Sequence, residues 1–388
     1  MKPLRILMVL HMPWDRNLGG PRVQMELADE FRSVGHIVEK FDILDAFPNG
    51  RRNLTRVLTP RAFAVRAREY VRRKADRFDI VDGHHGNLPY SKRELDFQGL
   101  LVARTGGFFP FYRDFDRYAK RRWPEKARGK LVARPLRWWE GFRVAPTYRR
   151  SLETADLVFL QNAEEYQYVN DVWGLGKKCV VLPCGLSDER AEALAAARRR
   201  TRHVREVTFI GYWNLRKGSA DWAAIVARIR AVLPATRFAF LGTAFTAEHV
   251  FRDLHLNSAE GVRVVPSYDS SELPTHLSTG KVGAFPSYIE GFGIGVLEML
   301  ASGLPTVAYD VPGPREMLKR LDSSLLVPPG EPVVFADRVV ELLSCSEDEL
   351  ADLSRRCIAT AAEFRLRTIA ARTLNEYRRG GRSAFTND

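Results

Sequence analysis

Short apolar runs recur along the whole chain, and their spacing constrains the fold more than any other feature. Each run is short enough to be one buried strand, and helical patterns lie between the runs. Continuous apolar strands that alternate with helices are typical of parallel sheets with both faces covered. We therefore predict strands at 4–10, 37–41, 80–81, 100–103, 157–160 and 179–182, and a second series at 207–211, 238–242, 262–265, 282–286, 305–309 and 325–327.

The two series of strands predict two α/β domains, each doubly wound. At roughly 150 residues per domain, the 388 residues suffice for two. We place the first domain at 1–190 and the second at 205–360, with 187–204 as a polar, helix-prone linker. The segment 361–388 is a helical tail. Two such domains leave a cleft between them, where ligands usually bind.

The stretch 108–150 differs from the rest of the first domain. It interleaves aromatic residues with many arginines and contains no clean strand, so we predict a partly helical, basic insertion. The net charge of +13 fits nucleic acid, an anionic membrane, a phosphorylated substrate or merely a well-solvated surface. No compact nucleic-acid motif accompanies the scattered basic residues, so we expect no nucleic-acid partner.

The chain shows no feature of a membrane-spanning or disulfide-bonded protein. It has no apolar run of 18 or more residues, and the apolar start is followed by Trp14, Asp15 and Arg16 instead of a cleavage site. Four cysteines, without histidines at zinc-finger spacing, fit reduced thiols better than a metal site. We expect a cytoplasmic protein without a metal site.

The strongest motif is the glycine-rich segment 286–298, which follows a strand and precedes a helix. Such a junction gathers backbone N–H groups at a helix N-terminus and favours an anion. Glu290 lies in the loop, and Glu298 lies in the first turns of the helix, where a carboxylate can bind paired sugar hydroxyls. The glycines alone would fit a tight turn, and Glu298 alone would fit helix-dipole pairing. Two glutamates around one glycine run favour a ligand site.

A second motif, 211–218, also follows a strand. It places Arg216 and Lys217 in a loop before a helix, and these two cations suit a pyrophosphate. Such pairs are common on protein surfaces, and this one gains weight from lying in the same domain as the glutamates.

The first domain offers weaker candidates at its strand ends. Gly19 and Gly20 lie in the opening loop, where they contact a phosphate or the acceptor, or form a flexible turn. His84 and His85 follow the strand at 80–81. The carboxyl ends of parallel strands are where such folds place functional groups.

Around Glu290 and Glu298 the sequence resembles glycosyltransferase family 4, with its Glu-x7-Glu signature. The resemblance extends to 301–305, 311–316, Gly19-Gly20, Gly35-His36, Ala155-Asp156 and Lys217-Gly218. It implies the GT-B fold, α/β with two Rossmann-like domains facing across a cleft. It also implies a C-terminal helix that crosses back to the first domain.

The resemblance assigns roles to residues of this chain. Glu298 would bind the nucleotide ribose, Glu290 and the glycine loop the transferred sugar, and Arg216 and Lys217 the leaving diphosphate. The chain departs from the family pattern at Tyr212, where members often have arginine, and at Gly106, where many have histidine. His84 could take part of that histidine's role. The predicted catalytic residues are Glu290, Arg216, Lys217 and His84, and the predicted donor-binding residues are Glu298, Gly291, Phe292, Gly293, Gly19, Gly20, Gly211 and Ser287.

These motifs and the resemblance together predict a glycosyltransferase that uses a nucleoside-diphosphate sugar, a UDP- or GDP-sugar, and the resemblance implies that it is a retaining enzyme. No tightly bound cofactor is expected and a metal is not essential, because the cations and a helix N-terminus stabilise the leaving group. The basic aromatic stretch indicates a glycan, lipid-linked or lipopolysaccharide-type acceptor of cell-envelope polysaccharide synthesis, and peripheral contact with the anionic inner face of the plasma membrane. A sugar-nucleotide epimerase of the same fold and a non-catalytic sugar-nucleotide-binding protein are the alternatives.

Overall fold

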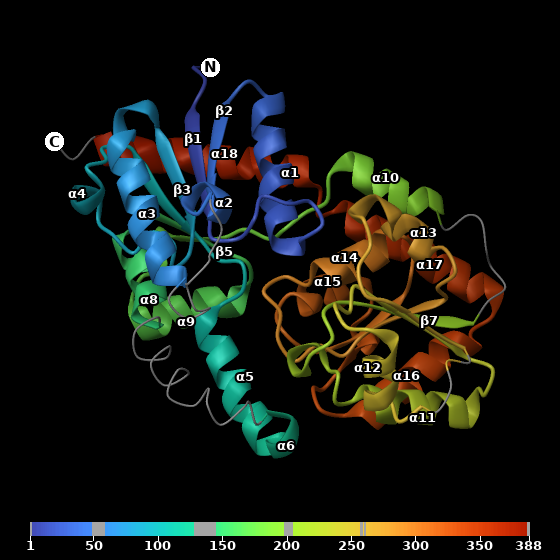
Figure 1. The fold of residues 1–388 in the computed structure, drawn as a ribbon. Helices are drawn as coiled ribbons and strands as arrows, with labels where there is room; N and C mark the ends of the chain where they lie inside the picture. Colours follow the sequence, from blue (N-terminus) through green and yellow to red (C-terminus); the bar gives the residue numbers. More distant parts are fainter. Residues whose placement is uncertain are drawn as a thin grey trace. The chain divides into compact units, whose positions relative to one another are not determined.

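A computed structural model describes residues 2–48, 59–127, 145–197, 205–256, 259 and 261–385 (Figure 1). The chain divides into two compact units. The first unit comprises Met1–Pro110, Arg128–Cys184 and Leu366–Asp388, and the second comprises Phe111–Ala127 and Gly185–Arg365.

The first unit is built on a six-stranded sheet in the order β2-β1-β3-β4-β5-β6, and its strand pairs are all parallel. The predicted strands of this half are all present, with ends that differ by up to three residues. Their bounds are β1 Arg5–Leu10, β2 Ile37–Asp42, β3 Ile80–His84, β4 Leu100–Arg104, β5 Leu157–Leu160 and β6 Cys179–Val181.

Helices cover both faces of this sheet because successive side chains of a strand point to opposite faces. In β1, Ile6 and Met8 pack with α1 and α18, whereas Leu7 and Val9 pack with α2 and α3. Both faces are therefore apolar, as expected for a parallel sheet. The helices are α1 Gly19–Ser33, α2 Ile43–Ala46, α3 Thr59–Arg73, η1 Ala75–Arg77, α4 Lys92–Leu95, α8 Ala145–Thr154, α9 Ala163–Trp173, η3 Gly176–Lys178 and α18 Leu366–Phe385.

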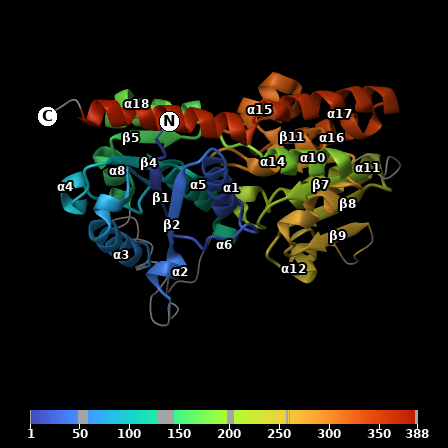
Figure 2. The same cartoon turned by 90° about the horizontal axis from the view of Figure 1, so that it is seen from above.

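The C-terminal helix α18 lies along the first sheet (Figure 2), and a buried polar network holds it there. Arg104 of β4 donates to Oδ2 of Asp82 on β3 at 2.7 Å, and the hydroxyl of Tyr377 on α18 donates to the same oxygen at 2.5 Å. Burial and the adjacent carboxylate raise the pKa of Tyr377 well above its usual value. Undocking α18 would remove the Tyr377 hydroxyl from the buried Asp82 carboxylate, which would lose one of its hydrogen-bond donors, so the network stabilises α18 on this unit.

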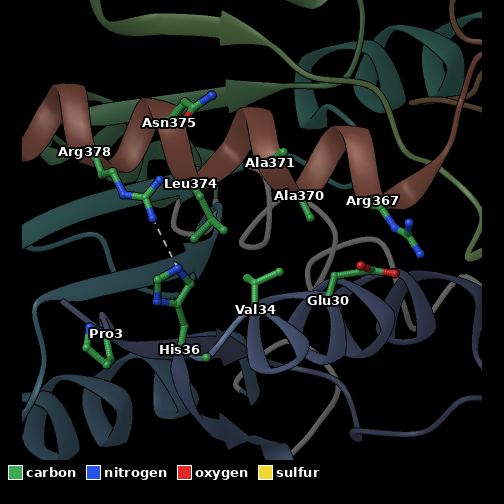
Figure 3. Close-up of a pocket in the computed structure, with 11 residues that line it drawn as sticks. Pro3, Glu30, Val34, His36, Arg367, Ala370, Ala371, Leu374, Asn375 and Arg378 are labelled. Atoms are coloured by element: carbon green, nitrogen blue, oxygen red, sulfur yellow. Dashed lines mark hydrogen bonds between the residues drawn. The ribbon is translucent and has the colours of Figure 1, made fainter. Parts of the chain in front are cut away.

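A pocket of about 400 Å³ lies between α18 and the end of α1 (Figure 3). On its wall, Nδ1 of His36 accepts a hydrogen bond from the Leu4 N–H at 3.0 Å, and Nε2 lies 3.5 Å from Nη2 of Arg378. Burial, followed by the charge of Arg378, lowers the pKa of His36. Through its bond to the Leu4 N–H, His36 ties the start of β1 to the chain after α1.

The second unit has its own six-stranded parallel sheet, in the order β12-β11-β10-β7-β8-β9. All predicted strands of this half are present too. Their bounds are β7 Glu206–Ile210, β8 Arg237–Leu241, β9 Val262–Val265, β10 Val282–Phe285, β11 Thr306–Tyr309 and β12 Leu326–Val327.

Helices lie on both sides of the second sheet as well (Figure 1). The fully buried Trp222 of α11 packs against Phe209 of β7 and Phe240 of β8, with ring centroids 5.5 and 4.8 Å away. The helices are α6 Pro124–Ala127, α10 Asp188–Ala197, η5 Leu215–Lys217, α11 Trp222–Val232, α12 Ala247–Asp253, η6 Ser270–Glu272, α13 Leu273–Leu277, α14 Ile294–Ala301, α15 Pro314–Leu321, η7 Ser323–Leu325, α16 Pro332–Ser344 and α17 Glu347–Ala362.

Two segments differ from the sequence-based expectation. The start of the predicted linker is helix α10, which packs on α13 and α14 and buries Leu194 completely, so it belongs to the second unit. Within the predicted insertion, α5 (Phe109–Arg122) continues into the second unit and α8 lies in the first, while 128–144 lies outside the described residues. Among the helices of the described ranges, none is long and apolar enough to cross a membrane.

Candidate functional site

The two motifs of the second unit meet at one edge of its sheet. Strands β7 and β10 are parallel neighbours, with Val207 paired to Val282 and Thr208 paired to Gly283. The loop 211–218 follows β7, and the loop 286–293 follows β10. The carboxyl edge of such a sheet is where ligands bind, so the topology alone brings both motifs to the expected place.

The two loops are joined by direct contacts. The Tyr288 N–H donates to the carbonyl oxygen of Arg216 at 2.8 Å, and the Ser287 hydroxyl oxygen lies 3.2 Å from the same carbonyl oxygen. Gly218 allows this close approach: it has φ +81°, and a Cβ there would lie 2.2 Å from the carbonyl oxygen of Pro286. The two loops therefore pack against each other and are joined by a backbone hydrogen bond.

Lys217 and Glu290 form an ion pair between the two loops. The Lys217 Nζ lies 2.5 Å from Oε1 of Glu290, and the Ser287 hydroxyl donates to the same oxygen at 2.5 Å. The two charged side chains are only 15% and 11% exposed. Burial lowers the pKa of Lys217, and the attraction of Glu290 opposes this shift. The ion pair therefore places a group of nearly zero net charge at the carboxyl edge of the sheet. Either of its two charged side chains can bind a ligand when the pair separates.

Arg216 and its neighbour Lys217 contact different aromatic rings. Its guanidinium lies over the ring of Tyr112 on α5, 4.9 Å from the centroid, whereas the Lys217 ammonium lies 4.7 Å from the centroid of the Phe285 ring. Such cation–π contacts hold a cation without neutralising it. The two residues that we predict to bind the diphosphate are thus adjacent in the chain but are supported by different aromatic rings.

Glu298 lies within α14 and is almost completely buried, with 2% of its surface exposed. The helix starts after Gly293, which adopts φ +84°. Arg190 of α10 donates to the Glu298 Oε1 from Nε at 2.8 Å and from Nη2 at 2.5 Å. Sequence reasoning missed Arg190 because the two residues are 108 positions apart; the apolar Leu194, one turn further along α10, was the only hint of a packed helix.

Tyr288, inside the glycine-rich loop, packs against aromatic residues of α5 and against Trp123, which directly follows α5. Its ring centroid lies 5.7 Å from Phe115, 5.6 Å from Tyr118 and 5.2 Å from Trp123. Its hydroxyl donates to Oδ2 of Asp221 at 2.5 Å. These contacts explain why Phe111–Ala127 groups with the second unit rather than with the first.

Asp221 accepts hydrogen bonds from two tyrosine hydroxyls, one of which belongs to this loop. Tyr309 of β11 donates to the same Oδ2 as Tyr288, at 2.7 Å. Burial raises the pKa of Asp221, and the two hydroxyl donors oppose this shift. Neither Asp221 nor Tyr309 belongs to a recognisable motif, so sequence spacing could not reveal this support of the loop.

The remaining predicted donor-binding residues of this unit have distinct positions. The Phe292 side chain is buried and lies 5.5 Å from the Phe364 ring, so it serves the core and can offer a ligand only its backbone. Gly291 and Gly293 share that loop, and Gly211 follows β7 directly, where its N–H donates to the carbonyl oxygen of Leu241 at 2.9 Å.

Gly19, Gly20 and His84 belong to the first unit. The two glycines are the first residues of α1, and His84 ends β3. A Cβ at Gly106 would lie 2.2 Å from Nε2 of His84, so this imidazole occupies the space that a side chain at position 106 would need. Gly106, where the chain departs from the pattern of the family it resembles, and His84, which we expect to take part of the missing role, are therefore in direct contact.

The imidazole of His84 is one of three at adjacent strand ends. Its ring centroid lies 5.5 Å from that of His11 and 4.7 Å from that of His85. Burial, followed by the neighbouring imidazoles, lowers the pKa of His84 well below its usual value and that of His85 to about 3. The His84 and His85 rings are neutral at pH 7, and a neutral imidazole can both donate and accept a hydrogen bond.

Two six-stranded parallel sheets, each covered by helices, define a protein of two Rossmann-like domains of the GT-B class. Residues 204–345 match the family described as "Glycosyl transferases group 1". D-inositol 3-phosphate glycosyltransferase of Thermobispora bispora is 34% identical over 122 residues, which cover 31% of this chain and 28% of that protein. The chain thus matches less than a third of the length of this curated relative.

Solved structures of similar fold extend over nearly the whole chain. Sucrose-phosphate synthase from Thermosynechococcus elongatus has a TM-score of 0.72 at 18% identity and covers 97% of this chain and 98% of its own. Anabaena HepE in complex with UDP and glucose has a TM-score of 0.65 at 15% identity, with 96% and 98% covered. At these identities the likeness establishes the fold.

Proposed function

We propose that the chain is a retaining glycosyltransferase that transfers a sugar from a nucleoside-diphosphate sugar, a UDP- or GDP-sugar, to a glycan, lipid-linked or lipopolysaccharide-type acceptor. One observation carries the proposal: Lys217 and Glu290, from loops that follow adjacent strands, form a buried ion pair at the carboxyl edge of the second sheet. The family match over 204–345 includes both residues.

The reaction breaks the bond between the anomeric carbon and the diphosphate, so its main requirement is to stabilise negative charge on the departing phosphates. Arg216 and Lys217 supply two cations, and the N-terminus of α14 supplies backbone N–H groups. Glu298 would accept hydrogen bonds from the ribose hydroxyls. These roles require no metal.

When the donor binds, Lys217 and Glu290 would separate and each would bind a group of the donor instead. The ammonium of Lys217 would turn to the diphosphate, and the carboxylate of Glu290 would then accept hydrogen bonds from hydroxyls of the transferred sugar. The Ser287 hydroxyl, which donates to Glu290 at 2.5 Å, would keep that carboxylate in place. The ion pair thus keeps both buried charges compensated before the donor binds.

In the first unit, His84 would take the role that a histidine at position 106 has in many family members. The overlap of His84 Nε2 with the side-chain space of Gly106 supports this assignment. A neutral imidazole can hydrogen-bond a sugar hydroxyl without adding a positive charge near the reacting carbon.

The basic residues support an anionic or amphiphilic acceptor at a membrane surface. Helix α5 exposes Arg113, Arg117 and Lys120, and the whole chain carries a net charge of +13. Clusters of basic residues attract anionic lipid headgroups and phosphorylated substrates. Binding to anionic vesicles that survives deletion of 108–150 would exclude this part of the proposal.

Thermal unfolding with UDP, GDP, ADP and CDP tests the donor site. A nucleotide at about 100 times its Kd should stabilise the wild type by roughly 2.7 kcal/mol. Glu298→Ala should abolish this stabilisation, whereas Glu341→Ala, which changes a glutamate with 60% of its side chain exposed in the same unit, should not. If no nucleotide stabilises the wild type, the donor site is assigned wrongly.

Turnover separates the enzyme from a protein that only binds the donor. We expect release of the nucleoside diphosphate from its sugar conjugate, and a kcat about 100-fold lower in Lys217→Ala and in Arg216→Ala. NMR of the product would show whether the anomeric configuration is retained. Nucleotide binding without turnover on any acceptor would indicate a non-catalytic sugar-nucleotide-binding protein.

A further inference from the structure

Helix α10 reaches the carboxylate of Glu298 through a single side chain. The Arg190 Nε and Nη2 donate to Oε1 of Glu298 at 2.8 and 2.5 Å, and its Nη1 donates to the carbonyl oxygen of Ser270 at 3.1 Å. The two charged side chains are only 10% and 3% exposed. The guanidinium is therefore held through all three of its nitrogens in a nearly dry environment.

This geometry orients the carboxylate as well as compensating its charge. Both bonds from Arg190 end on Oε1 of Glu298, so Oε2 is turned to a different side of the carboxylate. A planar guanidinium is preorganised for such bonds and loses little conformational freedom in forming them. The direction in which Glu298 presents its oxygens therefore depends on Arg190.

Arg190 is itself held by a helix that has its own anchors. Leu194 of α10 is fully buried, and Asp188 forms an ion pair with Arg365 at 3.5 Å. Helix α10 packs on α13 and α14 of the same unit (Figure 1). The guanidinium is consequently supported by a packed helix, which is how a side chain that positions a binding group must be supported.

We propose that Arg190 is a positioning residue that orients Glu298 toward the two ribose hydroxyls of the donor nucleotide. The inference rests on the proposed function and adds to it a residue outside both loops of the site. Arg190 acts through the carboxylate, so its effect on binding requires a nucleotide that has ribose hydroxyls.

The experiment compares ribose nucleotides with their 2′,3′-dideoxy analogues. Calorimetry would give the Kd of UDP, GDP or ADP, whichever binds the wild type, and of the matching dideoxynucleoside diphosphate. Arg190→Ala should raise the Kd of the ribose nucleotide about tenfold or more, because hydrogen bonds to a charged group are lost. It should leave the Kd of the dideoxy analogue unchanged, as expected when variant and analogue remove the same interaction.

Two further variants make the comparison robust. Arg190→Lys keeps the charge without the planar fork and should recover part of the ribose-dependent affinity. Arg228→Ala is the matched control: it removes an arginine of the same unit from an exposed ion pair with Asp337, 2.6 Å long and 44% and 42% exposed, and should change neither Kd. Circular dichroism and thermal unfolding identify folded variants, and Arg190→Lys carries the test if Arg190→Ala does not fold.

Three results would overturn the inference. Equal weakening of the ribose and dideoxy nucleotides would mean that Arg190 supports the unit generally. Tighter binding in Arg190→Ala would mean that the guanidinium competes with the ribose for Glu298. If the preference for ribose nucleotides is lost in Glu298→Ala but not in Arg190→Ala, the proposed function stands and only the role of Arg190 is excluded. If the wild type binds no nucleotide, both the proposed donor site and the role of Arg190 are excluded.

Discussion

Replacing Gly218 with alanine should separate the two loops of the candidate site. Gly218 has φ +81°, and an added Cβ would lie 2.2 Å from the carbonyl oxygen of Pro286. The left-handed conformation costs an alanine about 1–2 kcal/mol. The clash cannot be relieved by a side-chain rotation because the oxygen belongs to the backbone, so the loops must move apart by about 1 Å or more to reach ordinary contact distances.

Gly261→Ala provides a matched control in the same unit. Gly261 has φ +69°, and the nearest atom to an added Cβ is Nη2 of Arg230 at 3.2 Å, the far end of a flexible side chain. Both variants therefore incur the conformational cost of about 1–2 kcal/mol. Only Gly218→Ala adds the cost of overpacking, about 1–3 kcal/mol.

Urea unfolding measures the loss of stability, and an assay of donor turnover measures the damage to the site. We expect Gly218→Ala to be less stable than Gly261→Ala by about 1–3 kcal/mol. Donor turnover should fall about 100-fold, the typical result of a 1 Å misplacement of catalytic groups. If Gly218→Ala is no less stable and no less active than Gly261→Ala, the contact of the loops at Gly218 does not hold the site together.

Two further predictions concern the first unit. Gly106→Ala should displace the His84 imidazole and lower donor turnover as much as His84→Ala does, and the double variant should lose no more; an active Gly106→Ala beside an inactive His84→Ala would contradict this. The low pKa of His85, about 3, means that the unfolded chain binds a proton in the range from pH 6.5 to 3 that the folded chain does not, so acid removes stability. Between pH 7 and 5 the wild type should lose about 2 kcal/mol relative to His85→Phe in urea unfolding. The comparison with the variant is needed because burial raises the pKa of Glu165 to about 7, which has the opposite effect on stability, and a pH-independent difference would contradict the prediction.

Sequence pattern alone predicted the strands of both sheets and the two motifs of the second unit. This succeeded because buried parallel strands are continuous apolar runs, and because a glycine loop between a strand and a helix has a recognisable composition. Placing both motifs after strands was sufficient to bring them to one edge of the sheet, since the carboxyl ends of parallel strands lie together.

The tertiary structure decided which side chains hold the site residues. Arg190 and Glu298, Asp221 and Tyr288, and His84 and Gly106 are each brought together by packing between elements that are separate in the sequence. Short-range spacing carries no information about such pairs, because their distance depends on how helices cross the sheets. For the same reason the stretch 108–150 could be predicted as partly helical, whereas the packing of α5 on Tyr288 could not be predicted. An amphipathic helix has an apolar face, and only the folded chain determines what covers that face.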